Sequence, residues 1–332
     1  MTYIYVLVSS PDDYYYEQAL MSVTSLRIYM PKARLVLLAD NKTVSGFTGK
    51  RVALKKLVTE IITVPFADTV QKTERSRLIK TSIPDYIDGP FLYIDCDTII
   101  CDDLSAIRDY GYELAGVLDC HVFLNDHIHK DYFLERDRRL GFSGTKAAGY
   151  NINGGLLYAE NNDLTKRFFT AWNDAWRYSA YRKHDFHDQS ALNQANYLTG
   201  LKIKLLPGEW NCQPAHGGLA FLGSAKIVHY FSSEFKASNY IPYYKLADVQ
   251  LQQRIKESGS IPADILQMIQ QPKFQFNKVQ LISDQRIVSI MQSPLLFTLA
   301  DLKTHAAPVF KFLERQTKFF RKLGKLLAHT TS

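Results

Sequence analysis

Short apolar runs alternate with helix-compatible segments along the first 120 residues of the chain. Runs rich in Val, Ile, Leu, Phe and Tyr occupy residues 3–8, 34–39, 61–64 and 91–94. Segments compatible with helices lie between them, at 16–29, 44–57 and 73–82. Strands that alternate with helices are typical of a mostly parallel sheet built from βαβ units. The sequence therefore predicts an α/β fold with helices flanking the sheet.

The alternation continues less regularly to about residue 240. Further strands are predicted at 113–118, 154–159, 203–206 and 226–229, and further helices at 125–140, 163–178 and 188–198. Beyond residue 240 the strand signals fade, and helices and loops are expected. We therefore predict a main domain over residues 1–240 and a mainly helical C-terminal region over residues 241–332.

The composition is that of a globular protein, with 46% hydrophobic and 22% charged residues among 332. The four cysteines form no C-x-x-C pair, which argues against structural zinc and disulfides and fits a reducing cytoplasm. The first residues, MTYIYVLVSS, lack the basic start and long apolar core of a signal peptide. No run reaches the roughly 18 apolar residues of a transmembrane helix. We therefore expect a cytoplasmic protein.

The net charge of +7 is concentrated near the C-terminus. Residues 308–328 contain six basic residues and one acidic residue, and without them the chain has 34 basic and 32 acidic residues. This distribution argues against a nucleic-acid-binding protein. Apolar residues recur at helical spacing in the same segment, which predicts a basic amphipathic helix. Such a helix either packs on the main domain or lies on an anionic membrane surface.

A strand-like run ends in two carboxylates in the segment FLYIDCDTIICDDL, residues 91–104. Alternate residues of an extended chain point the same way, so Asp95 and Asp97 can converge on one cation. Hard divalent cations take oxygen ligands and often complete their shell with substrate phosphates. The pair therefore indicates a metal and diphosphate site, although Asp-x-Asp also occurs in ordinary turns and helix caps.

His229 ends the strand-like run IVH in the same way. A lone histidine is more often a structural hydrogen-bonding residue than a ligand. In a chain that already offers Asp95 and Asp97, it completes a reasonable Mn²⁺ shell with positions left for phosphate oxygens. We therefore predict that these three side chains form one metal site.

The remaining candidates carry weaker signals. The turn after the first strand has neither the G-x-G-x-x-G pattern nor a P-loop lysine, so a nucleotide would contact the backbone near Val8 and Ser9 and stack on Tyr15. These residues could equally cover the edge of the sheet. Arg77 lies upstream of the carboxylates in a segment with Arg75 and Lys80, and guanidinium suits phosphate. Charged helix residues nevertheless usually face solvent.

At this point the chain resembles a known family, the retaining glycosyltransferases of family 8, which include glycogenin and bacterial lipooligosaccharide α-galactosyltransferases. Six blocks in the expected order carry the resemblance, over roughly residues 3–236. They are the first strand with its tyrosine-containing turn, SRLIKTSIPDYI, FLYIDCDTIICDDL, GYNINGGLLYAEN, FHDQSALNQ and IVHYF.

The resemblance implies a GT-A fold, a UDP-sugar donor and Mn²⁺, with Mg²⁺ as the alternative, held by Asp95, Asp97 and His229. It implies roles near the anomeric carbon for Asp188 and Gln189, although Asp188 could also be only a helix cap. It places the other donor contacts at Arg77, Asp119, Asn153, Gly155 and Lys236. The family commonly has a glycine and a lysine-proline pair after the metal histidine, and HYFSSEFKASNY lacks both, so the register of Lys236 is open.

We therefore expect residues 1–240 to be a GT-A catalytic domain that moves galactose or glucose from UDP to a glycan or glycolipid of the cell surface. The protein would be cytoplasmic, or peripheral on the inner face of the plasma membrane. A sugar-1-phosphate nucleotidyltransferase is one alternative, but the first turn lacks the Gly-rich phosphate loop of that class. The other is a non-catalytic sugar-binding or membrane-binding protein of the same fold.

Overall fold

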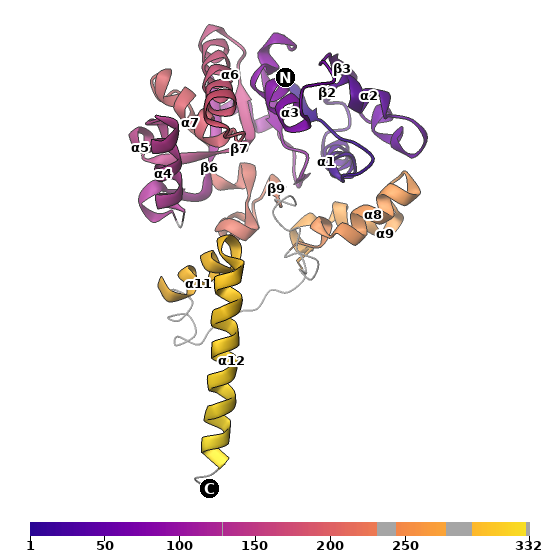
Figure 1. Cartoon of the computed structure of the whole chain (residues 1–332). Helices are drawn as coiled ribbons and strands as arrows, with labels where there is room; N and C mark the ends of the chain where they lie inside the picture. Colours follow the sequence, from indigo (N-terminus) through magenta and orange to yellow (C-terminus); the bar gives the residue numbers. More distant parts are fainter. Residues whose placement is uncertain (128, 231–243, 277–293, 330–332) are drawn as a thin grey trace. The chain divides into compact units, whose positions relative to one another are not determined.

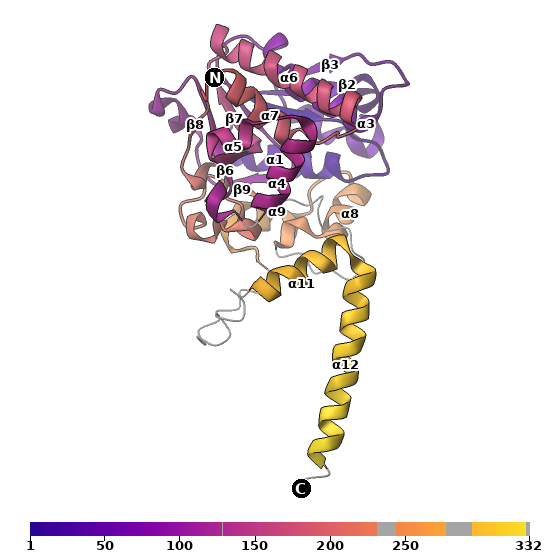
Figure 2. The same cartoon turned by 60° about the vertical axis from the view of Figure 1, so that its left-hand side comes forward.

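The structure is a computed structural model that describes residues 1–127, 129–230, 244–276 and 294–329 (Figures 1 and 2). The chain forms two compact units, Met1–Asn277 and Lys278–Ser332, and each is described by itself. Among the described residues, no helix is long and apolar enough to cross a membrane.

A seven-stranded sheet in the order β3-β2-β1-β4-β7-β6-β8 forms the centre of the first unit. Its strands are β1 (Thr2–Leu7), β2 (Arg34–Asp40), β3 (Glu60–Val64), β4 (Phe91–Ile94), β6 (Leu114–Phe123), β7 (Tyr150–Ala159) and β8 (Lys204–Leu205). Only β7 runs against its neighbours. The prediction of a mostly parallel sheet is confirmed. Two short strands outside this sheet, β5 (Thr98–Ile100) and β9 (Ile227–His229), pair antiparallel.

Helices cover both faces of the sheet, so the core has two layers. On β1, Tyr3, Tyr5 and Leu7 belong to one apolar cluster, and the alternate residues Ile4 and Val6 belong to the other, as strand geometry requires. The first cluster includes residues of α1 (Tyr15–Tyr29), α8 (Val249–Ser258) and α9 (Ala263–Gln270). The second includes residues of α3 (Lys72–Thr81), α6 (Asp163–Lys183) and α7 (Gln189–Leu198).

The predicted helix at 44–57 is wrong. The structure has a short helix α2 (Asn41–Ser45), followed by 3₁₀ turns at Gly49–Arg51 and Ala53–Lys56. Gly46 follows the last residue of α2, and Gly49 has a φ of +53° that interrupts the helical backbone. The helix predicted at 125–140 corresponds to α4 (Lys130–Leu140), and the short helix α5 (Gly144–Ala148) was not predicted.

The first unit continues beyond the predicted domain boundary near residue 240. Helices α8 and α9 belong to the same unit as the sheet, and Figure 1 shows them beside α1. The Tyr14 hydroxyl donates to Gln253 Oε1 at 2.9 Å, and Lys256 Nζ donates to the Asp13 carbonyl at 2.9 Å. The second unit contains α11 (Pro294–His305) and α12 (Ala307–His329).

The packing of α5 on α7 gives a stability prediction. A Cβ at Gly144 would lie 2.2 Å from the carbonyl oxygen of Asn193, which is helix backbone and cannot move aside. We expect Gly144→Ala to lower the free energy of unfolding by about 2–3 kcal/mol, measured by urea titration. Gly223→Ala is the control, because a Cβ there meets nothing within 4 Å. Equal stability of the two variants would contradict the packing.

Candidate active site

Two strand ends bring three of the predicted side chains together. Asp95 and Asp97 follow β4, while β5 and β9 pair so that Thr98 lies opposite His229. The Tyr230 N–H donates to the Asp97 carbonyl at 3.1 Å, which fixes the two segments side by side. The ligand atoms of Asp95, Asp97 and His229 consequently lie within 4.8 Å of one another. His229 Nε2 is 3.2 Å from Asp97 Oδ1.

The other nitrogen of His229 is already bound. Its Nδ1 lies 3.0 Å from Asn211 Oδ1, and the Asn211 Nδ2 donates to Asn153 Oδ1 at 2.9 Å. Since an amide oxygen only accepts, Nδ1 carries the proton and donates. Nε2 is therefore the nitrogen that faces the two carboxylates, as a metal ligand would. Oxygen ligands with one imidazole fit Mn²⁺, and Mg²⁺ less well.

The charges of Asp97 and His229 support each other. Burial alone would raise the pKa of Asp97, but the neighbouring His229 outweighs burial and holds that pKa below its ordinary value. Burial alone would lower the pKa of His229, and Asp97 raises it. Asp97 and His229 therefore favour each other's charged forms, and a cation held here would bind the deprotonated Nε2.

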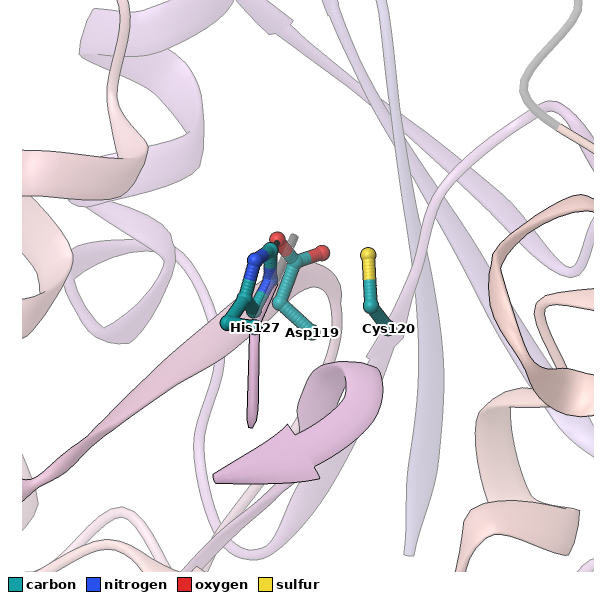
Figure 3. Close-up of side chains that lie close together, drawn as sticks. All are labelled: Asp119, Cys120 and His127. Carbon is teal, nitrogen blue, oxygen red and sulfur yellow. Dashed lines mark ion pairs between the residues drawn. The ribbon is translucent and has the colours of Figure 1, made fainter. Parts of the chain in front are cut away.

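A second group of possible ligands, Asp119, Cys120 and His127, occurs among the residues that the structure describes (Figure 3). Here the backbone N–H of His129 donates to His127 Nδ1 at 3.0 Å. Nδ1 therefore has no proton, and the neutral ring carries its proton on Nε2, 3.5 Å from Asp119 Oδ2. A protonated Nε2 cannot bind a metal. This ring faces the Asp119 carboxylate as a donor, and the cluster is a poor metal site.

Asp119 is held as an anion between amides. Asn153 Nδ2 donates to its Oδ1 at 2.9 Å, and Asn151 Nδ2 donates to its Oδ2 at 3.4 Å. Burial would raise the pKa of Asp119, but His127, Asn153 and the nearby Gln189 amide lower it below the ordinary value. A backbone irregularity in β6 directly follows, with Cys120 and His121 in the left-handed region.

Two cationic side chains, Lys80 and Arg77, lie beside Asp188, and Lys80 also contacts Asp95. Lys80 Nζ is 3.2 Å from Asp188 Oδ2 and 3.5 Å from Asp95 Oδ1, and its side chain is only 5% exposed. Arg77 Nε is 3.3 Å from Asp188 Oδ1. Burial would raise the pKa of Asp188, but Arg77 and Lys80 outweigh it and hold that pKa well below its ordinary value. Asp188 is therefore a carboxylate throughout the physiological range.

The predicted nucleotide-binding turn is mostly occupied by internal contacts. Ser9 N donates to Thr43 Oγ1 at 2.8 Å, and its hydroxyl donates to Asp13 Oδ1 at 2.8 Å. Val8 is buried, and Tyr15 is 37% exposed with Lys72 Nζ 4.9 Å from its ring centre. Of these three, Tyr15 has the side chain most accessible to a ligand. The predicted phosphate contact Lys236 lies outside the described residues.

Sequence reasoning named Lys80 only as a neighbour of Arg77, and it missed Tyr93, Asn211 and His127. Lys80 follows Arg77 by three positions on α3, and this spacing places both on one helix face. Tyr93, whose hydroxyl donates to Asp95 Oδ1, also lies two residues before it on an extended chain. No sequence signal marked Asn211 or His127, because their roles depend on contacts between segments far apart in the chain.

Gly155 makes room for the His229 ring. A Cβ at this position would lie 2.3 Å from His229 Cε1 and 2.9 Å from Asn153 Oδ1. Its carbonyl also accepts the Asp95 N–H at 2.9 Å. The absence of a side chain thus leaves the space that the His229 ring fills.

We therefore expect Gly155→Ala to displace His229 and to weaken Mn²⁺ binding about tenfold or more, the range for disturbed ligand orientation. Isothermal titration of the purified protein with Mn²⁺ measures this. Gly154→Ala is the control, since its nearest contact is an ordinary 3.4 Å to Lys80 Nζ. Unchanged Mn²⁺ affinity in Gly155→Ala would show that His229 does not ligate the ion.

The fold has known counterparts, although no profile of a known sequence family and no curated protein matches the chain. The galactosyltransferase LgtC, solved with donor and acceptor sugar analogs, is similar at a TM-score of 0.50 and 14% identity, over 80% of this chain and 98% of that one. A structure of an active-site mutant of LgtC gives the same values.

Two further structures are similar at TM-scores below 0.5. Mouse xyloside xylosyltransferase 1 gives 0.47 at 10% identity, over 69% of this chain and 97% of that one. The glycosyltransferase GlyE of Streptococcus pneumoniae TIGR4 gives 0.49 at 15% identity, over 85% and 66%. Because this chain and LgtC are only 14% identical, their similarity concerns the fold alone. The chain has the GT-A glycosyltransferase fold.

Proposed function

We propose that this protein is a metal-dependent, retaining glycosyltransferase that uses a UDP-sugar as donor. The observation that carries the proposal is the meeting of Asp95, Asp97 and His229 at the strand ends, within 4.8 Å of one another. In open α/β sheets, ligands bind outside the carboxyl ends of the strands. The likeness to LgtC, a galactosyltransferase solved with donor and acceptor sugar analogs, supports this choice.

The three ligands would hold Mn²⁺, or Mg²⁺ as the alternative. When bound, this cation stabilises the negative charge that develops on the leaving diphosphate. Arg77 supplies a further positive charge and two-point hydrogen bonding suited to phosphate. Lys80 Nζ lies 3.2 Å from Asp188 Oδ2 and 3.5 Å from Asp95 Oδ1, so one ammonium group contacts both carboxylates.

The donor sugar would lie between Asp119 and Asp188. Asn153 and Asn151 hold the Asp119 carboxylate, which retains capacity to accept a hydrogen bond from a sugar hydroxyl. Asp188 and Gln189 are adjacent at the start of α7. An anionic Asp188 can stabilise the positive charge that develops at the anomeric carbon, while Gln189 orients the sugar.

In the reaction, the bond between the anomeric carbon and the diphosphate oxygen breaks, and a bond to the acceptor oxygen forms. The acceptor proton passes to the diphosphate, and the configuration at the anomeric carbon is retained. We propose galactose or glucose as the transferred sugar and a glycan or glycolipid of the cell surface as the acceptor.

The test is UDP release from a panel of UDP-sugars with and without Mn²⁺. We expect metal-dependent release from one or two donors, and a loss of about 100-fold or more for Asp97→Asn, as for removal of a transition-state stabilising group. Asp102→Asn is the matched control, because Asp102 is exposed and pairs with Lys226 Nζ at 3.2 Å. If no nucleotide sugar is turned over in a metal-dependent way, the proposal fails.

We also propose that the protein lies on the inner face of the plasma membrane through α12. Large apolar side chains of this helix are exposed, including Phe312 at 59% and Phe319 at 58%. Lys311, Arg315 and Lys318 lie along the same helix. A helix with both kinds of residue can lie in the plane of an anionic leaflet. Such docking would place the enzyme beside a lipid-linked acceptor.

For this surface we expect the triple variant Lys311→Gln, Arg315→Gln, Lys318→Gln to bind phosphatidylserine vesicles roughly tenfold or more weakly, since each basic residue contributes at most about 1 kcal/mol. Vesicle sedimentation measures the binding. The control removes three exposed charges from α6 through Lys166→Gln, Arg167→Gln and Lys183→Gln. Equal binding by both triple variants and the unchanged protein would end the proposal.

A further inference from the structure

We propose that Asn211 is a positioning residue for His229, the proposed metal ligand. Asn153 links this pair to Asp119, the proposed contact of the donor sugar. The inference rests on the proposed function and extends it, because it connects two parts of the site that lie on different strands. Neither asparagine side chain would touch the metal. Each would act through its neighbour.

The link is a continuous chain of hydrogen bonds in the interior. Asn153 Nδ2 donates to Asp119 Oδ1 at 2.9 Å, and Asn211 Nδ2 donates to Asn153 Oδ1 at 2.9 Å. The chain ends at His229, whose Nδ1 is 3.0 Å from Asn211 Oδ1. All four residues are buried, and Asn211 is completely so. Buried polar chains of this kind are stable only when each member is satisfied.

The groups at the Asp119 end of this chain of hydrogen bonds determine which atom donates and which accepts in each bond. The Gly155 backbone N–H donates to Asn153 Oδ1 at 3.0 Å, and a backbone N–H can only donate. Asp119 is an anion and can only accept. Both constraints orient the Asn153 amide in the same way, with its oxygen toward Asn211. The nitrogen of Asn211 must then face Asn153, and its oxygen must face His229.

This orientation matters for His229. An acceptor at Nδ1 keeps a proton on Nδ1 and turns Nε2 toward Asp95 and Asp97. The backbone supports the same arrangement, because the His229 N–H donates to the Cys212 carbonyl at 2.8 Å and holds the 211–212 segment against β9. Without an acceptor at position 211, the buried Nδ1–H group would lose its hydrogen bond to Asn211, and the tautomer protonated on Nδ1 would no longer be favoured.

His127 in the second cluster shows that the hydrogen-bond partner of Nδ1 determines which ring nitrogen carries the proton. His127 Nδ1 faces a backbone N–H donor, so its Nε2 keeps a proton and turns it toward Asp119. His229 Nδ1 donates to an amide oxygen, so Nε2 is the nitrogen that faces Asp95 and Asp97. One hydrogen-bond partner thus separates a metal ligand from a hydrogen-bond donor within the same site.

Substitution of Asn211 tests the inference through Mn²⁺ affinity without any donor. We expect Asn211→Leu to weaken Mn²⁺ binding 10- to 100-fold, the range for outer partners of metal-binding histidines. Asn211→Asp keeps an oxygen at Nδ1 but removes the donor to Asn153. We expect it to retain Mn²⁺ affinity within about threefold or to bind more tightly, while the KM for the UDP-sugar rises about threefold or more.

Asn196→Leu is the control, because it removes a buried asparagine that is not part of this chain of hydrogen bonds. Asn196 lies in the C-terminal half of α7, and its side-chain oxygen accepts the Ile203 N–H at 3.0 Å. We expect this variant to lose thermal stability while its Mn²⁺ affinity stays that of the unchanged protein. Thermal unfolding of all three variants separates reduced stability from reduced metal binding.

Three results would overturn the inference. Unchanged Mn²⁺ affinity in Asn211→Leu would do so, as would equal weakening by Asn211→Leu and Asn196→Leu. If Asn211→Leu does not fold, a tenfold or larger loss of affinity in Asn211→Asp is the deciding contrary result. In each case the unchanged protein still binds Mn²⁺ and releases UDP, so the proposed function stands. If the unchanged protein does not bind Mn²⁺, the inference and the metal-dependent function fail together.

Discussion

Four carboxylates meet at one edge of the sheet, and the arrangement of the site depends on how their mutual repulsion is offset. Asp95, Asp97, Asp119 and Asp188 come from different segments, and like charges in a poorly solvated place would take up protons. Lys80 and Arg77 offset Asp188, and Lys80 also reaches Asp95. His229 offsets Asp97, and neutral amides solvate Asp119. Each of these carboxylates thus has a cationic or hydrogen-bonding partner within contact distance.

This division of partners also separates the parts of the site by chemistry. Asp188 pairs with both Arg77 and Lys80, so a further cation there gains little, because the charge is already balanced. Where a carboxylate is paired with a histidine, a divalent cation can replace the proton. Where it is held by amides, it can accept hydroxyl groups without competing for metal. Aspartate residues therefore serve three different purposes in this site, and the residues that contact each aspartate determine which one.

The sequence predicted the parts of the fold that follow from local pattern. The strands at 34–39 and 91–94 and the helix at 16–29 lie within about a residue of β2, β4 and α1, because alternating and helical patterns reflect burial directly. The helix at 44–57 failed because Gly46 and Gly49 break the backbone where composition alone still permits a helix. Within the site, side chains at strand ends could be expected from position, as with Asp95 and His229. Asn211 and His127 could not, since 58 residues separate Asn211 from its hydrogen-bond partner Asn153.

The packing of α8 and α9 against α1 has a consequence for how the protein is made. β1 is synthesised well before α9, and Ile265 and Ile269 of α9 belong to the apolar cluster on one face of β1. The Tyr14–Gln253 contact spans 239 residues, and such distant closure is slow. Until α8 and α9 have been synthesised, the apolar cluster on this side of the nascent sheet is covered by α1 without them. Between synthesis of the sheet and arrival of these helices, the growing chain needs protection from aggregation, the task of chaperones that act during translation.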